Sequence, residues 1–266
     1  MYYKMNDKNF NENIIDDYKI KYDNIKKENK KIIYEIKNYN ERTQIFGYEF
    51  VKKNKDKCYI IYNNKKYKLK SEFKFDKNGP NELELYEVEQ IKDLSYMFSN
   101  VFSINSFEFL SNWDLSNIEN ISNMFECTYI NDLKPLSKWN TSNINNMSGL
   151  FRKRKMKEKL IHDLNPIKNW DVSNVQDMSY MFYGTNINSL KPLEKWDLFK
   201  VIKVQYMFNS CHYLNSLEGI ENWTLFNCID ISGMFSHCSN IKSLIPLKNW
   251  DTSKIKNFLL FIFRFK

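Results

Sequence analysis

The sequence lacks several features that would place it in a common class of protein. It contains no alanine, and its 266 residues include only six glycines and five cysteines. So few cysteines do not make the disulfide framework of a small secreted domain. No apolar run approaches the ~20 residues that a membrane-spanning helix needs, and the first residues lack the apolar core of a signal peptide. The residues alone therefore favour a cytoplasmic location, and the missing alanine indicates an AT-rich genome.

The motifs of common enzymes are also missing. The chain has three histidines and contains no HExxH, GxSxG, phosphate-loop or dinucleotide-binding glycine motif. Catalysis needs unlike reactive groups that converge on one pocket, whereas a repeated sequence places like residues in rows. We therefore expect a protein without enzymatic activity, metal ion or cofactor.

Aromatic residues are abundant, and they mark a repeat. The chain has 20 Phe, 17 Tyr and 6 Trp, which argues for packed structure because disordered chains are poor in aromatic residues. Every tryptophan begins a unit of about 26 residues, at Trp113, Trp139, Trp170, Trp196, Trp223 and Trp250. The unit at Trp170 reads WDVSNVQDMSYMF, and a leading partial unit, IKDLSYMF, fits the same frame with Tyr86 in the Trp position.

Proline and aspartate occupy fixed places in this unit. Four of the five prolines lie just before a Trp, in LKPL, LNPI, LKPL and LIPL. Because proline cannot donate to a sheet ladder, we expect a strand end or a turn there. Asp or Asn follows most tryptophans; a calcium ladder would be one interpretation, but we expect these side chains to cap turns through backbone N–H groups.

Apolar residues recur 5, 8, 11 and 12 positions after each Trp. The last three have the spacing of one helical turn. Elements this short are not stable alone, but they become stable when identical neighbours stack Trp on Trp and Met on Met. The pattern predicts an α/β repeat solenoid of short parallel strands and short helices around a continuous core.

The repeated pattern WDxSNVxxMSxMFxxC, from Tyr86 to about Phe261, resembles the BspA-type leucine-rich-repeat surface proteins of mycoplasmas, other bacteria and protists. The resemblance implies a right-handed leucine-rich-repeat-like solenoid that is surface-located or mediates protein contacts. It brings no catalytic residues with it. A cell-surface location by resemblance and a cytoplasmic location by composition both stay open.

The first third of the chain carries no repeat. Residues 1–30 are expected to be helical or flexible, with a helix over 12–29, and residues 31–85 to form a β-rich cap before the repeats of 86–266. The expected strands cover 32–36, 44–51, 58–62 and 66–69, with a hairpin turn at Asn63 and Asn64. A cap is expected because the end of a solenoid exposes apolar core and strand edges.

Two surface features are candidate sites. The residues one and two positions before Trp would line an open face if a strand lay beside them: Asn112, Lys138, Lys168, Asn169, Glu194, Lys195, Glu221, Asn222, Lys248 and Asn249. The unit after Trp139 has five extra residues and a basic run, which predicts either a solvated loop or a patch for nucleic acid or anionic membrane. Its basic residues are Arg152, Lys153, Arg154, Lys155, Lys157 and Lys159.

Cys211 and Cys238 sit at equivalent places in adjacent units, beside His212 and His237. We expect reduced core thiols, with a disulfide or a Cys2His2 zinc site as alternatives. Cys58, Cys127 and Cys228 are expected to be small core residues.

The function predicted from the sequence is a scaffold for an unknown protein partner. The alternatives are a nucleic-acid or anionic-membrane binder, which would use the basic N-terminal third and residues 152–159, and an exported surface adhesin. Self-association is a further expectation, because the C-terminal segment FLLFIF has no visible cap.

Overall fold

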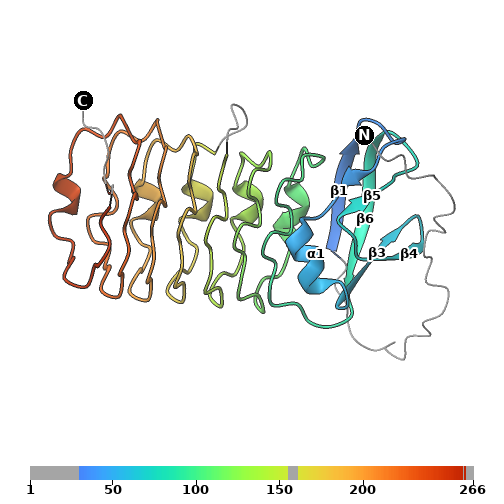
Figure 1. The fold of residues 1–266 in the computed structure, drawn as a ribbon, viewed down its shortest axis with the longest axis horizontal. Coiled ribbons are helices and arrows are strands. Elements are labelled where there is room, and N and C mark those ends of the chain that lie inside the picture. The colour runs from blue at the N-terminus through green and yellow to red at the C-terminus, as the bar shows by residue number, and fades with distance from the viewer. Residues whose placement is uncertain (1–29, 155–160, 260, 262–266) are drawn as a thin grey trace, which may run out of the picture.

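The computed structural model describes residues 30–154, 161–259 and 261. An N-terminal antiparallel sheet is followed by largely irregular chain that coils repeatedly around an aromatic core (Figure 1). Each sequence repeat forms one coil, and successive coils lie side by side from the sheet to the C-terminal end (Figure 1). None of the helices in these described ranges is long and apolar enough to cross a membrane. The helix expected over 12–29 lies outside the described residues.

The cap is built on a four-stranded sheet of order β1-β6-β3-β4 in which all neighbours are antiparallel. Its strands are β1 (Lys30–Ile36), β3 (Cys58–Tyr62), β4 (Lys65–Lys68) and β6 (Gly79–Glu87). The predicted strands at 32–36, 58–62 and 66–69 are thus confirmed, although the sequence did not reveal β6. Asn63 and Asn64 join β3 to β4 with φ values of 48° and 60°, the left-handed conformation that a two-residue hairpin turn requires.

The strand predicted over 44–51 is wrong. Only β2 (Thr43–Gln44), which pairs with β5 (Glu72–Phe73), is extended, and α1 (Tyr48–Asn54) follows it. Gly47 lies between β2 and α1, and a Cβ atom there would be 2.0 Å from the carbonyl oxygen of Tyr96. The chain turns at this close contact, and α1 then lies between the sheet and the first coil (Figure 1).

The first coil begins after Tyr86 rather than with it. Tyr86 belongs to β6, and its ring stacks on Tyr59 at a centroid separation of 5.1 Å. Tyr86 thus keeps the Trp position in the sequence frame, but its ring packs within the cap sheet and not in the Trp column. The partial unit nevertheless joins the stack, since Asp93 forms a parallel bridge with Asn120 of the next coil.

The coils are joined by isolated parallel bridges, not by the short parallel strands that we expected. One residue of each coil, seven positions after Trp, takes part in the series Asp93, Asn120, Asn146, Asp177, Lys203, Asp230 and Asn257. Beyond the bridge, alternate N–H groups donate to the next coil, such as Tyr96 to Ser122 at 2.9 Å and Phe98 to Met124 at 3.0 Å. The intervening N–H groups close turns within the coil.

This alternation also excludes the predicted helical turn. The residues 10 positions after Trp and most of those 14 positions after it, such as Tyr180 at φ 61° and Gly184 at φ 70°, are left-handed; Lys153, at position 14, is an exception. A left-handed residue between Met178 and Met181 prevents the regular helix that the 3,4 spacing indicated. We call this stretch, 7 to 14 residues after each Trp, the bridged segment.

The helices of the repeats are short 3-10 turns at the proline slot. Each of the four that contain proline has it in its first turn, where its missing N–H costs no hydrogen bond. They are η2 (Lys134–Leu136), η3 (Asn165–Ile167), η4 (Lys191–Leu193) and η5 (Ile245–Leu247), and η1 (Glu108–Asn112) precedes them without proline. The expectation of a turn there is confirmed. Capping after Trp is confirmed too, for example by the Ser173 N–H, which donates to the Asp171 carboxylate at 3.0 Å.

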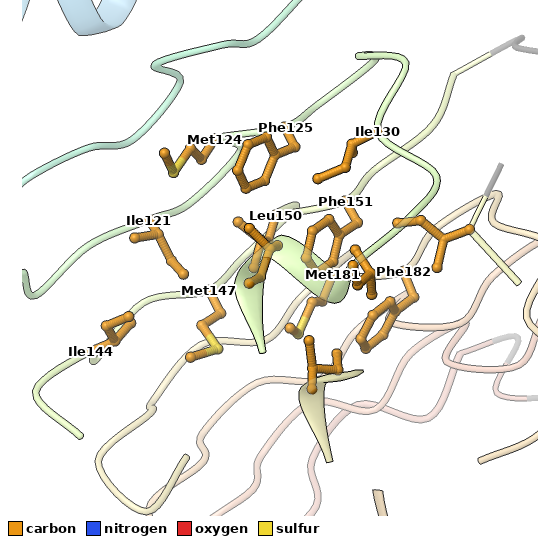
Figure 2. Packing of buried hydrophobic residues seen from close by; sticks show 14 of the residues in the cluster. Ile121, Met124, Phe125, Ile130, Ile144, Met147, Leu150, Phe151, Met181 and Phe182 are labelled. Atoms are coloured by element: carbon orange, nitrogen blue, oxygen red, sulfur yellow. The ribbon is translucent and has the colours of Figure 1, made fainter. Parts of the chain in front are cut away.

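The core is a set of aromatic and aliphatic columns that run through all coils. In the units from Trp113 to Trp223, the Phe 12 positions after Trp stacks on its equivalent in the adjacent coil, with centroids 5.8 Å apart for Phe125 and Phe151 and again for Phe151 and Phe182. Figure 2 shows these three rings beside a second column of Met and Leu side chains. Trp139 likewise stacks on Trp170 at 6.1 Å, so the stacked core is confirmed.

Most indole N–H groups also tie one coil to the coil before it. Nε1 of Trp170 donates to the Leu136 carbonyl at 3.0 Å, and Trp139, Trp223 and Trp250 make the equivalent bond. Nε1 of Trp196 is buried without a hydrogen-bond partner. One ring column thus contains both a satisfied and an unsatisfied donor.

This difference predicts unequal costs for the same substitution. Trp170→Phe leaves the Leu136 carbonyl without its donor, whereas Trp196→Phe removes a donor that had no acceptor. Since both lose the same ring volume, we expect Trp170→Phe to lower the free energy of unfolding by about 1–3 kcal/mol more than Trp196→Phe. Urea titration of both variants measures this; an equal or larger loss for Trp196→Phe would contradict the indole bonding.

Candidate functional site

The predicted binding face before each Trp does not lie beside a strand. Most of its residues directly follow a 3-10 helix; Asn112 is the last residue of η1, and Glu221 and Asn222 lie in a turn. All are away in sequence from the bridged segment. All ten are exposed except Glu221, which is partly buried and accepts a hydrogen bond from the Gly219 N–H at 2.7 Å. This face was predicted on the condition that a strand lay beside it, and that condition is wrong. Its side chains are nevertheless accessible.

Four residues of this face line a hollow between two coils. Lys168, Asn169, Glu194 and Lys195 border a cavity of about 550 Å³. Lys191 pairs with Glu194 at 2.8 Å, and this hydrogen bond lowers the pKa of the Glu194 carboxyl. The hollow is thus lined by charged side chains, two of which already pair with each other.

The predicted basic patch is broken up by the fold. Arg152 is half-buried and lies 3.9 Å from the Glu126 carboxylate, and the exposed Arg154 lies 3.2 Å from the same group. Lys153 is only 2% exposed, so its inclusion in a surface patch is wrong. Lys155, Lys157 and Lys159 lie outside the described residues.

Lys153 is held inside the stack by backbone acceptors. Its Nζ donates to the carbonyl oxygens of Thr128 at 2.5 Å and Ile130 at 3.2 Å. Burial penalises the charged amine and lowers the pKa of Lys153 to about 7. The backbone N–H of Lys153 also donates to the Tyr183 carbonyl of the next coil at 2.8 Å, so this residue is bonded to the coils on both sides of it.

The residues 10 and 13 positions after Trp, counted from Tyr86 in the first coil, form a face of the stack that we call the bridged face; six of its twelve residues are half-buried and the other six are buried. The sequence did not reveal this face because the stretch was predicted to be a helical turn. The sequence signal that marks it is the variable residue x in MSxMF, which lies 10 positions after Trp. Its members are Tyr96, Ser99, Asn123, Glu126, Gly149, Arg152, Tyr180, Tyr183, Tyr206, Asn209, Gly233 and Ser236.

The centre of the bridged face is a column of stacked side chains. The Arg152 guanidinium lies 4.5 Å from the ring centroid of Tyr180, whose other neighbour is Tyr206 at 5.0 Å. The Tyr206 ring in turn covers Gly233, where a Cβ atom would be 2.3 Å from the ring. Arg152 Nε is buried and has no hydrogen-bond partner, so the column retains an unused donor.

The cysteines are part of the core. All five are buried free thiols, as expected for Cys58, Cys127 and Cys228. The Cys211 thiol donates to the Phe182 carbonyl at 3.3 Å and the Cys238 thiol to Phe208 at 3.0 Å. The neighbouring histidines are exposed, so thiols and imidazoles do not share one site. Across the described ranges, no group of three or more potential ligand side chains could hold a metal ion.

These features define a capped repeat protein whose coils share one core. A family model described as a Mycoplasma protein of unknown function, DUF285, matches residues 67–185 and, in a second copy, residues 153–264. Together the two matches cover most of the chain, which therefore belongs to the DUF285 family. No curated protein and no solved structure matches the chain.

The burial of Lys153 predicts a pH dependence of stability. Its folded pKa of about 7 lies below its ordinary value of 10.5, so the unfolded chain binds more protons between these values. The free energy of unfolding contributed by Lys153 is therefore lowest below about pH 7 and rises with pH up to about 10.5.

Lys153→Met removes this ionisable group and is the appropriate reference. The free energy of unfolding of the wild type minus that of Lys153→Met should increase from about pH 7 to about pH 10 in urea titrations. The same comparison with the exposed Lys200→Met serves as a control for the loss of a surface charge. A constant difference for Lys153→Met would show that the amine is not desolvated.

Proposed function

We propose that the chain is a non-enzymatic scaffold for protein–protein interaction, built as a leucine-rich-repeat-like solenoid with an N-terminal β cap. The proposal rests on coils that are joined by the same backbone bridges from Asp93 to Asn257. Such stacking places equivalent side chains in rows, and repeat proteins bind partners along rows of this kind.

The composition of the bridged face carries the proposal. Six of its twelve residues are half-buried and can be reached by a partner, and all six are Tyr, Asn or Arg: Tyr96, Asn123, Arg152, Tyr180, Tyr183 and Tyr206. These are the types that predominate in antibody paratopes, because Tyr gives a large contact area at low entropy cost and small polar residues adapt their hydrogen bonds. Tyr and Arg are also enriched among residues that dominate binding energy.

The bridged face is also rigid before any partner arrives. Arg152 is held between the Glu126 carboxylate and the Tyr180 ring. Tyr180 and Tyr206 project from left-handed positions that the bridges between coils fix on both sides. Side chains that are already ordered lose little freedom on binding, so more of the contact energy appears as affinity.

The other candidate surfaces support this function less well. The face before each Trp contains four lysines and two glutamates among its ten residues, and both types are depleted at protein interfaces. The nucleic-acid hypothesis is weakened because Lys153 is buried and both arginines face Glu126. The bridged face is thus the better place for a protein partner.

A double substitution tests this proposal. Tyr180→Asn/Tyr206→Asn removes the two stacked rings while introducing a residue that tolerates positive φ better than Tyr and already occupies the equivalent place at Asn123. The variant should therefore fold but fail to retain the proteins that the wild type captures from native lysate.

The matched control is Lys168→Ser/Lys195→Ser on the face before Trp, which should capture the same proteins as the wild type. Thermal melting of all three chains shows that any loss is not due to unfolding. If the lysine variant loses the captured proteins and the tyrosine variant keeps them, the assignment to the bridged face is wrong.

A further inference from the structure

The residues 3, 4 and 6 positions after Trp form a separate edge of the stack. A cavity of about 440 Å³ is lined by positions 4 and 6 of the earlier coils, including Asn143, Asn145, Asn174 and Gln176. The two positions therefore open onto one surface. Position 3 adjoins them, since the Lys254 amine at position 4 lies 3.5 Å from the ring centroid of Phe226 at position 3.

The chemistry of this edge changes abruptly along the stack. Position 3 is Ser in the units at Trp113, Trp139, Trp170 and Trp250, but Phe199 and Phe226 occupy it in the two between. Position 6 changes in the same two units from Glu, Asn or Gln to Ile202 and Ile229. Both changes concern partly or fully exposed positions, so packing of the core does not demand them.

The two phenylalanines form one ordered apolar feature. Their rings are stacked with centroids 5.5 Å apart and planes at 3°. Phe199 is 48% exposed and Phe226 is 41% exposed. Exposed aromatic rings contribute little to the stability of the fold. When a binding partner covers them, their apolar surface is removed from water, which stabilises the complex.

The charge around the rings has one sign. Lys200, Lys254 and Lys256 occupy positions 4 and 6, and these three coils have no Asp or Glu at positions 3, 4 or 6. Within the described part of the chain none of these lysines forms an ion pair. The Asp197 and Asp251 carboxylates, just after Trp, accept the N–H groups of Phe199 and Ser253 instead.

We propose that this aromatic-lysine patch (Phe199, Phe226, Ile202, Ile229, Lys200, Lys254 and Lys256) binds a protein segment in which apolar side chains are flanked by Asp or Glu. The apolar side chains cover the two rings, and the carboxylates pair with the surrounding lysines. An apolar centre with a charged rim is the arrangement of protein interfaces. The patch is separate from the bridged face and goes beyond the function proposed above.

A protein segment fits better than a lipid surface. Residues that insert into a membrane must enter the boundary between headgroups and acyl chains by ~5–10 Å. Both rings are less than half exposed, and Phe226 lies between Phe199 and the Lys254 amine. Rings held this closely present their edges to a partner and do not protrude as an anchor.

The repeats supply the variant that tests this proposal. Phe199→Ser/Phe226→Ser restores the residue found at position 3 in the other Trp-led units, so the chain should fold as the wild type does, which thermal melting checks. A random-peptide display library is selected on the full wild-type chain, with the double variant as counter-selection. We expect the enriched peptides to combine aromatic or aliphatic residues with Asp and Glu.

Affinities of the enriched peptides decide the outcome. The dissociation constant should rise about tenfold or more for the double variant and also for Lys254→Ser, whereas Phe102→Ser, an equally exposed Phe elsewhere, and the Tyr180→Asn/Tyr206→Asn variant should bind normally. Enriched peptides without acidic residues, or no peptide that distinguishes wild type from double variant, would overturn the proposal. So would binding of phosphatidylserine vesicles that Phe199→Ser/Phe226→Ser abolishes, since the patch would then be a membrane site.

Discussion

The structure depends on contacts that each coil can make only with its neighbours. Phe151 stacks on Phe125 on one side and on Phe182 on the other, and each separation is 5.8 Å. The backbone follows the same rule, because alternate N–H groups of the bridged segment find their acceptors in the next coil. A single coil would leave these groups unpaired, so it has no stability of its own. The β cap and α1 provide the first coil with a neighbour on its N-terminal side, where the Gly47 N–H donates to the Met97 carbonyl at 2.9 Å.

This constraint divides the repeat into positions that are fixed and positions that are free. Core columns must match from coil to coil, whereas the backbone bridges recur at one position with Asp, Asn or Lys there, and the side chains that point outward need not match. The unlike residues accordingly gather on surfaces: the Arg152, Tyr180 and Tyr206 column on the bridged face, and the Phe199 and Phe226 pair on the edge. If the chain is the scaffold proposed above, outward side chains can change without changing the fold. The two proposed binding surfaces are both departures from the repeat that the core does not require.

The sequence predicts the features that depend on one residue and its period. The Trp spacing gives the coils and their stacked core, proline predicts the turn before each Trp, and Asn63 and Asn64 predict the hairpin. The sequence does not predict features that arise only when segments distant in the chain come into contact. The helix α1 follows the contact of Gly47 with Tyr96, and Lys153 is buried where its amine meets the Thr128 and Ile130 carbonyls. The bridged segment was wrongly predicted to be a helical turn, because Tyr180 and Tyr206 adopt the left-handed conformation, which non-glycine residues rarely adopt.

Hydrogen exchange tests the central claim most directly, namely that the coils are held to one another by alternate backbone bonds. In the coil that begins at Trp170, the N–H groups of Met178, Tyr180, Phe182 and Gly184 donate to the next coil. Resolved to single amides, these four groups should exchange only with global unfolding of the stack, far more slowly than exposed loop amides. Exchange of these amides at the rate of exposed loops would contradict the account, because the coils would then not be joined through their backbones.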